Sequence, residues 1–133
     1  MINLNRKRKT LITILIVFFV MVCYCIWSDY TVKDKGVFTI GTLNKIEGAR
    51  SGLRLSFSFN FKGVNYNIDY IEPIGNVYMS DIGKRFFIQV LPDNPNNQNR
   101  VVVNIRVPDN IEPVPFNGWS KKWIEYNYPK CLQ

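Results

Sequence analysis

Seven carboxylates in the second half of the chain are the residues best suited to acid–base chemistry. Two carboxyl groups about 5 to 10 Å apart in a concave site can cleave a glycosidic bond. Acidic side chains in loops are most often simply solvated. A glycan hydrolase that uses carboxylates alone is therefore the second of two alternatives to the function predicted at the end of this section. The carboxylates are those of Asp69, Glu72, Asp81, Asp93, Asp109, Glu112 and Glu125.

The chain contains no histidine, and this removes several kinds of chemistry. A Ser-His or Cys-His nucleophilic pair cannot be built, and the commonest metal ligand is missing. Cys23 and Cys25 lie in an apolar run and Cys131 lies near the end, so the domain beyond the run cannot form an internal disulfide. We therefore expect no enzymatic activity, no cofactor and no metal site, and a domain that is stabilised by its apolar core.

The candidate binding residues lie near the C-terminus, where aromatic and basic side chains are interleaved. Such a mixture favours a docking surface for a protein, or contact with the headgroup layer of a membrane. The opposing interpretation is that Trp119 and Trp123 close the open end of a β domain. Ser120 can cap one short helix that ends before Pro129. The candidates are Trp119, Lys121, Lys122, Trp123, Tyr126 and Tyr128.

An uncharged run from Leu11 to Trp27 directly follows four consecutive basic residues at positions 6–9. A helix of this length measures roughly 26 Å, near the lower limit for crossing a hydrocarbon core of about 30 Å, and the flanking polar residues can extend it. The basic cluster predicts that the N-terminus stays in the cytoplasm, and the aromatic residues Tyr24, Trp27 and Tyr30 mark the outer boundary. We predict a basic cytoplasmic tail at 1–10, a transmembrane anchor at 11–28 and a stalk at 29–36.

A cleaved secretory signal is the competing interpretation of this run. Such signals have an apolar stretch of about 7 to 15 residues and end in small residues. Here the stretch is longer and its exit reads Cys-Ile-Trp-Ser-Asp, which favours an uncleaved anchor. Lipid attachment at Cys23 is a further alternative, but lipoprotein signals place Gly, Ala or Ser where this chain has Val22.

The net charge of +7 arises largely from the N-terminal cluster. The chain has 17 basic and 10 acidic residues, and four of the basic ones lie at positions 6–9, which leaves an excess of +3 for everything that follows. The excess is therefore mainly a topology signal, and we expect no nucleic-acid partner. The expected partners are membrane lipid, through the anchor, and another protein.

The clearest pattern in the chain predicts a β-hairpin over residues 53–70. Apolar and polar residues alternate strictly on both sides of Lys62-Gly63, and a two-residue turn there matches apolar with apolar and polar with polar. The predicted apolar pairs are Phe61 with Val64, Phe59 with Tyr66, Phe57 with Ile68 and Leu55 with Tyr70. The predicted polar pairs are Asn60 with Asn65, Ser58 with Asn67 and Ser56 with Asp69.

Three further strands are predicted, over Val37–Ile46, Arg85–Leu91 and Val101–Val107. Gly41 suggests a bulge or bend in the first of them, and residues 71–83 form a connection in which Val77-Tyr78-Met79 can add a short extended piece. In the last strand Val101, Val103, Ile105 and Val107 share one face. The predicted fold class is all-β: a small five-stranded antiparallel barrel or curled sheet over residues 37–107, after one N-terminal transmembrane helix and before a Pro/aromatic tail at 108–133.

Several segments give the chain a resemblance to a known family. They are the hairpin Phe57–Tyr66 with its aromatic-x-x-x-Gly-x-x-Tyr spacing, the segment Gly83–Val90 and the turn Pro92-Asp93-Asn94-Pro95. In these the chain resembles an uncharacterised bacterial family of membrane-anchored small β domains. The resemblance covers about residues 37–107 and implies a fold and a membrane setting. It implies no activity.

Together these observations predict a single-pass protein of the cytoplasmic (inner) membrane. Its C-terminal domain is expected outside the cytoplasm, in the periplasm if the cell is Gram-negative. The expected function is that of an extracytoplasmic protein-binding or envelope-assembly module. A membrane-tethered immunity protein against a toxin is the first alternative.

Overall fold

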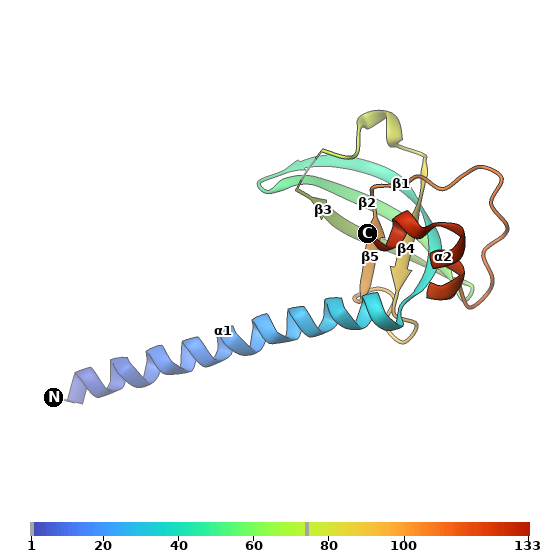
Figure 1. The fold of residues 1–133 in the computed structure, drawn as a ribbon. Helices are drawn as coiled ribbons and strands as arrows, with labels where there is room; N and C mark the ends of the chain where they lie inside the picture. Colours follow the sequence, from blue (N-terminus) through green and yellow to red (C-terminus); the bar gives the residue numbers. More distant parts are fainter. Residues whose placement is uncertain (1, 74) are drawn as a thin grey trace.

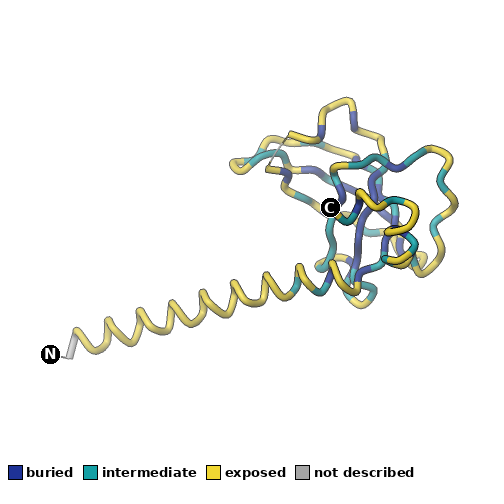
Figure 2. The backbone as a smooth tube through the Cα atoms, in the orientation of Figure 1, coloured by how far each residue is buried: buried dark blue, intermediate teal, exposed yellow. Residues whose placement is uncertain are grey.

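In the computed structural model, which describes residues 2–73 and 75–133, one long helix leads into an antiparallel sheet (Figure 1). The helix α1 covers Ile2–Lys35, about 51 Å at 1.5 Å per residue. Its large apolar side chains between Leu4 and Trp27 are exposed on all sides, which Figure 2 shows as a continuous yellow coil. By length and composition it can cross a membrane.

Five strands form the sheet, as predicted. They are β1 (Val37–Ala49), β2 (Gly52–Phe61), β3 (Val64–Glu72), β4 (Arg85–Val90) and β5 (Asn99–Val102), in the order β3-β2-β1-β4-β5. All four pairings are antiparallel. Among the described residues β3 and β5 do not pair, so the sheet is an open half-barrel. The curled sheet is confirmed, the closed barrel is not formed, and with α1 the chain is not purely all-β.

The predicted hairpin has the predicted register. All seven pairs occur between β2 and β3, from Phe61 opposite Val64 to Leu55 opposite Tyr70. The turn residues Lys62 and Gly63 have φ angles of 51° and 77°, which is the left-handed region that two-residue hairpin turns require. On the outer face Asn60 Nδ2 donates to Asn65 Oδ1 at 2.9 Å, so the polar pairs also interact directly.

The prediction for the last strand is wrong beyond Val102. Val101 and Val103 pack in one hydrophobic cluster, whereas Ile105 and Val107 pack in a second. The chain bends between them at Asn104, whose Nδ2 donates to the carbonyl oxygen of Lys130 at 3.1 Å. The alternation of apolar residues therefore continues past a bend in the backbone, and it does not indicate a single strand.

Two hydrophobic clusters lie on opposite sides of the sheet. The first fills the inside of the curl with side chains from all five strands, among them Phe57, Ile68 and Val101. The second lies on the outer side, where Phe38 and Phe87 pack under the C-terminal tail. From Phe86 to Val90 every residue of β4 is buried, because this strand is covered on both faces.

Gly41 has a different role from the predicted bend. The register shift in β1 lies further along, between Leu43 and Lys45. A Cβ at Gly41 would overlap the Cδ1 atom of Ile88, which is completely buried. Glycine at this position therefore makes room for a side chain of the inner cluster.

The helix joins the sheet without a flexible segment, since the region predicted as a stalk is helical as far as Lys35. Val32 is buried, and its carbonyl oxygen accepts a hydrogen bond from the backbone N–H of Gly36 at 2.8 Å. The buried side chain of Gln89 in β4 donates through Nε2 to the Lys33 carbonyl at 3.3 Å. Gln98 Nε2 donates to Ser28 Oγ at 3.2 Å. These contacts hold the end of α1 against β4 and the loop that precedes β5.

Replacement of Gly36 by alanine is expected to lower the free energy of unfolding of the domain by about 1–3 kcal/mol. The added Cβ would overlap the carbonyl oxygen of Val32 and lie 2.7 Å from Cγ of Gln89. Denaturant unfolding of the full chain in detergent, followed by near-ultraviolet circular dichroism, measures the change. Gly48→Ala is the matched control, because a Cβ there meets nothing within 4 Å. Equal stability of the two variants would contradict the packed junction.

Candidate functional site

The C-terminal tail contains the short helix that the sequence predicts. The helix α2 covers Lys121–Asn127 and is followed by a 3-10 turn, η2, at Pro129–Leu132. Ser120 is the N-cap of α2, and the Ser120 Oγ accepts a hydrogen bond from the backbone N–H of Trp123 at 3.2 Å. The cap and the proline after the helix fix both of its ends, as expected.

Aromatic packing attaches this tail to the outer side of the sheet. Trp119 is buried and exchanges two backbone hydrogen bonds with Phe38, at 2.9 and 2.8 Å. Its ring stacks on Trp123 with centroids 4.8 Å apart. Tyr128 lies 5.1 Å from the ring of Phe87 in β4. Trp119 and Trp123 thus cover the outer side of the sheet, not the open end of a barrel.

This packing divides the six predicted binding residues into two groups. Trp119 is buried, and Lys121, Trp123 and Tyr128 are half-buried. Lys122 and Tyr126 are exposed, and Tyr126 has 87% of its surface free. A partner can therefore reach the tail chiefly through Lys122 and Tyr126, and the binding role of the cluster stays a prediction.

A second exposed apolar surface lies in the connection between β3 and β4. We call residues 78–82 the knuckle; it contains the 3-10 turn η1 at Met79–Asp81 and projects at the top of Figure 1. Val77 is buried in the inner cluster directly before it. Tyr78 and Met79 are each 67% exposed and Ile82 is 43% exposed, so three large apolar side chains face solvent within five residues.

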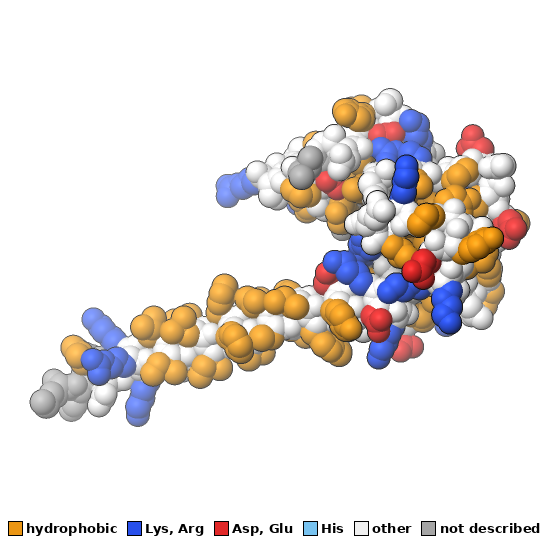
Figure 3. All heavy atoms as spheres, in the orientation of Figure 1, with side chains coloured by type: hydrophobic (Ala, Val, Ile, Leu, Met, Phe, Trp, Pro, Cys, Tyr) orange, Lys and Arg blue, Asp and Glu red, His pale blue; other side chains and the backbone are white. Residues whose placement is uncertain are grey.

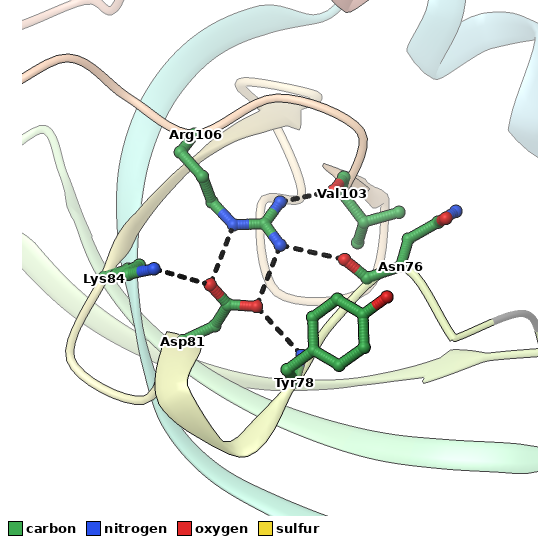
Figure 4. A network of polar contacts seen from close by, with 6 residues as sticks. All are labelled: Asn76, Tyr78, Asp81, Lys84, Val103 and Arg106. Atoms are coloured by element: carbon green, nitrogen blue, oxygen red, sulfur yellow. Dashed lines mark hydrogen bonds and ion pairs between the residues drawn. The ribbon is translucent and has the colours of Figure 1, made fainter.

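A buried carboxylate holds the knuckle in place (Figure 4). Asp81 is 4% exposed. Arg106 donates to it through Nη2 at 2.9 Å and through Nε at 3.3 Å. The backbone N–H of Tyr78 donates to the same carboxylate at 2.9 Å, and Lys84 Nζ donates at 3.0 Å.

Arg106 extends the network to the rest of the domain. Its Nη1 donates to the carbonyl of Val103 at 2.6 Å, and its Nη2 donates to the carbonyl of Asn76 at 2.8 Å. The guanidinium carbon also lies 4.3 Å from the centroid of the Phe86 ring, in cation–π geometry. The knuckle is thus linked to the segment after β5 and to the inner cluster.

The network explains the charge state of Asp81. Hydrogen bonds from Arg106 hold the pKa of the Asp81 carboxyl well below its ordinary value, and those from Tyr78 and Lys84 act in the same direction. Burial opposes them and is overcome. A carboxyl with a lowered pKa and several donors is a structural anion, because a general acid needs a pKa near the working pH.

The other carboxylates do not form a pair in the hollows described next to the knuckle and the tail. A hollow of about 410 Å³ is lined by Lys84, Arg85, Arg106 and Asp109, together with Gly83, Val107 and Pro108, so it contains one carboxylate. A second, of about 420 Å³, lies between the β2–β3 turn and Phe116 and has none among its lining residues. Among the described residues no three His, Cys, Asp or Glu side chains are grouped to hold a metal ion.

The sequence predicts only a connection over residues 71–83, with a short extended piece at residues 77–79. In the structure β3 continues to Glu72, and Met79 begins a 3-10 turn and not a strand. A signal for the knuckle was present, because Val77, Tyr78, Met79 and Ile82 give a stretch bracketed by Gly75 and Gly83 more apolar character than a solvated loop requires. The partner of Asp81, however, lies 25 residues away at Arg106. Nothing in the spacing of these two residues predicts their contact.

Comparison with known proteins gives no family assignment: no family model matches the chain, and no curated protein and no solved structure matches it significantly. The resemblance to membrane-anchored small β domains stays a prediction. The class that the structure itself defines is an open five-stranded curled sheet on one long N-terminal apolar helix.

Replacement of Asp81 by asparagine is expected to destabilise the domain by about 2–4 kcal/mol, because it leaves the partly buried guanidinium of Arg106 without its anion. Asp109→Asn is the matched control, since the Asp109 side chain is fully exposed and lies 3.8 Å from Arg85. Denaturant unfolding of the full chain in detergent measures both. A loss no larger than that of the control would show that the network contributes little.

Comparison of the wild type with Asp81→Asn also tests how stability depends on acid pH. Because the pKa of Asp81 is lower in the folded state than its ordinary value of 3.8, the unfolded state binds the proton first as the pH falls. The stabilisation is therefore complete above about pH 5 and declines as the pH drops below the ordinary value. Between roughly pH 6 and pH 3, the free energy of unfolding should therefore fall more steeply for the wild type than for Asp81→Asn.

Proposed function

We propose that this chain is a membrane-anchored module that binds another protein outside the cytoplasm through the knuckle. The observation that carries the proposal is the exposure of Tyr78, Met79 and Ile82 on a turn that is held by a buried ion pair. Exposed apolar groups gathered on one surface are typical of sites where proteins associate.

The anchor is supported by the surroundings of α1. A helix that is apolar on every side needs an apolar environment, either a protein core or a lipid bilayer. No part of its most apolar stretch is buried in the protein, so the bilayer is the fitting environment. Figure 3 shows apolar side chains around the helix and basic side chains near its N-terminal end. The basic end stays in the cytoplasm under the positive-inside rule.

The end of α1 is packed into the sheet domain. Val32 is 3% exposed because the sheet domain covers it, and Ser28 accepts a hydrogen bond from Gln98. Both contacts lie just beyond the apolar run, so the proposed anchor continues without interruption into the folded domain.

The chemistry of the knuckle suits recognition of a protein. Tyrosine and methionine are enriched in protein interfaces, and methionine adapts its shape to a partner. The Asp81–Arg106 pair fixes the turn before binding, which reduces the entropy lost on association. In Figure 1 the knuckle projects sideways from the direction of α1, so a partner anchored in the same membrane can reach it.

Two kinds of partner fit this function. An envelope assembly would supply a neighbouring membrane protein, and an immunity role would supply an incoming toxin. The lateral direction of the knuckle favours the first. The hydrolase alternative gains no support, because the buried carboxylate of Asp81 is paired with Arg106.

Labelling of intact cells tests the exported location. The native Cys131 is a poor reporter, because it is 1% exposed and burial raises the pKa of its thiol to about 11. Glu125→Cys places a thiol on the exposed side of α2, and Asn5→Cys places one in the basic N-terminal region. A membrane-impermeant maleimide should label position 125 in intact cells, and it should label position 5 only after the cells are lysed. The reverse pattern would refute the proposed topology.

Site-specific photo-crosslinking tests the knuckle as the binding surface. A photoreactive amino acid at Met79 should give one major adduct in growing cells, because this side chain is 67% exposed and lies in the knuckle between Tyr78 and Ile82. Tyr126 is the comparison position, since it is also exposed but lies on the tail. Addition of Ile82→Asp should reduce the adduct at Met79 about tenfold, as loss of an interface contact does. An adduct at Tyr126 and none at Met79 would assign binding to the tail instead.

A further inference from the structure

The turn between β1 and β2 occupies an unusual place relative to α1. In Figure 1 it points back in the direction of the N-terminus of α1, while α2 lies at the opposite side of the domain. The space-filling view shows the same overhang, with a basic side chain at its tip (Figure 3). If α1 crosses a bilayer, this turn is the part of the sheet that points at the membrane surface.

The junction keeps the turn in this direction. Gln98 bonds to Ser28, and Gln89 bonds to the carbonyl of Lys33, so the sheet is attached to two successive turns of α1. Gly36 then allows β1 to begin immediately after the helix. The sheet therefore does not swing freely around the end of the anchor.

The charge of the turn suits an anionic surface. Residues 45–54 contain three basic side chains and one acidic side chain. Lys45 forms an ion pair with Glu47, while Arg50 in the turn and Arg54 in β2 are exposed. Arg54 lies across from Glu47 in the strand pairing, but the ion pair of Glu47 is with Lys45. Three basic residues against one acidic residue leave a net charge of +2.

We propose that the β1–β2 turn binds the phosphate groups of anionic lipids in the membrane that α1 spans. Guanidinium groups bind phosphate oxygens with two parallel hydrogen bonds, and the anionic surface attracts basic residues that are held within a Debye length. The proposal rests on the proposed membrane anchor. It adds a second attachment point, which sets the side towards which the domain leans and the tilt of α1. Transmembrane helices tilt by about 20° on average, so such a lean is ordinary.

Fluorescence quenching of the full chain in lipid nanodiscs tests the contact. Ser51→Cys, in the exposed turn, carries an environment-sensitive fluorophore, and Glu125→Cys carries the same fluorophore on α2 as the comparison. The discs contain phosphatidylcholine with a nitroxide on its headgroup, with or without phosphatidylglycerol. With phosphatidylglycerol, quenching at position 51 should exceed quenching at position 125 by about twofold or more, and high salt should reduce it.

Charge reversal separates lipid binding from mere proximity. Arg50→Glu together with Arg54→Glu should bring quenching at position 51 down to the level at position 125. Lys62→Glu together with Lys130→Glu makes the same change of charge away from the β1–β2 turn and should leave the quenching at position 51 unaltered. Equal quenching at the two positions, or quenching at position 51 that ignores both charge reversal and lipid charge, would overturn the proposal.

The outcomes also separate this proposal from the proposed function. Failure of the anchor would appear as loss of the chain from the discs, before any quenching is measured. Failure of the knuckle as a binding surface would appear as a missing adduct at Met79 in cells. Neither result depends on the charge of the β1–β2 turn.

Discussion

The structure depends on covering both faces of β4. Phe86, Ile88 and Val90 face the inside of the curl, and Phe87 faces outward. An open sheet of five strands can cover the inner face of β4 by curling. Its own strands cannot cover the outer face. The C-terminal tail supplies that cover with the stacked rings of Trp119 and Trp123. Gln89, on the outer face, also reaches the end of α1, so the same strand connects the tail, the sheet and the helix.

The parts of the fold that were predicted correctly are those set by neighbours in the sequence. The hairpin register follows from strict alternation and from one glycine in a two-residue turn, and Ser120 caps α2 through a residue three positions away. The end of β5 was predicted wrongly because the chain leaves the sheet after Val102 and packs Ile105 and Val107 into the second cluster, where Asn104 bonds to the distant Lys130. The stalk proved helical because nothing before Gly36 breaks the helix, and Lys33 pairs with Asp29 one turn earlier at 2.8 Å.

The candidate site shows the same difference between features set by sequence neighbours and features set by distant residues. The aromatic residues of the tail were noticed because they are close together in the sequence, yet the structure uses most of them for packing. The knuckle was missed because Asp81 and Arg106 come from separate connections and meet only in the folded chain. Burying a carboxylate is unfavourable unless its partners are in place, so this pair defines one shape of the loop and excludes others. A loop with no task beyond joining β3 to β4 would not need that restriction.

The position of α1 gives each surface of the domain a different neighbour. Because the helix enters the sheet directly, the β1–β2 turn points towards the N-terminal end of α1, and the loop before β5 is held against the helix by Gln98 and Ser28. The knuckle then lies to the side and the tail lies away from the anchor. A flexible stalk would let any of these surfaces meet any partner. Under the proposed topology, the helical connection instead directs the basic turn towards lipid and the exposed apolar residues along the membrane plane. The continuity of α1 as far as Lys35 is therefore what turns a set of surface features into a directional arrangement.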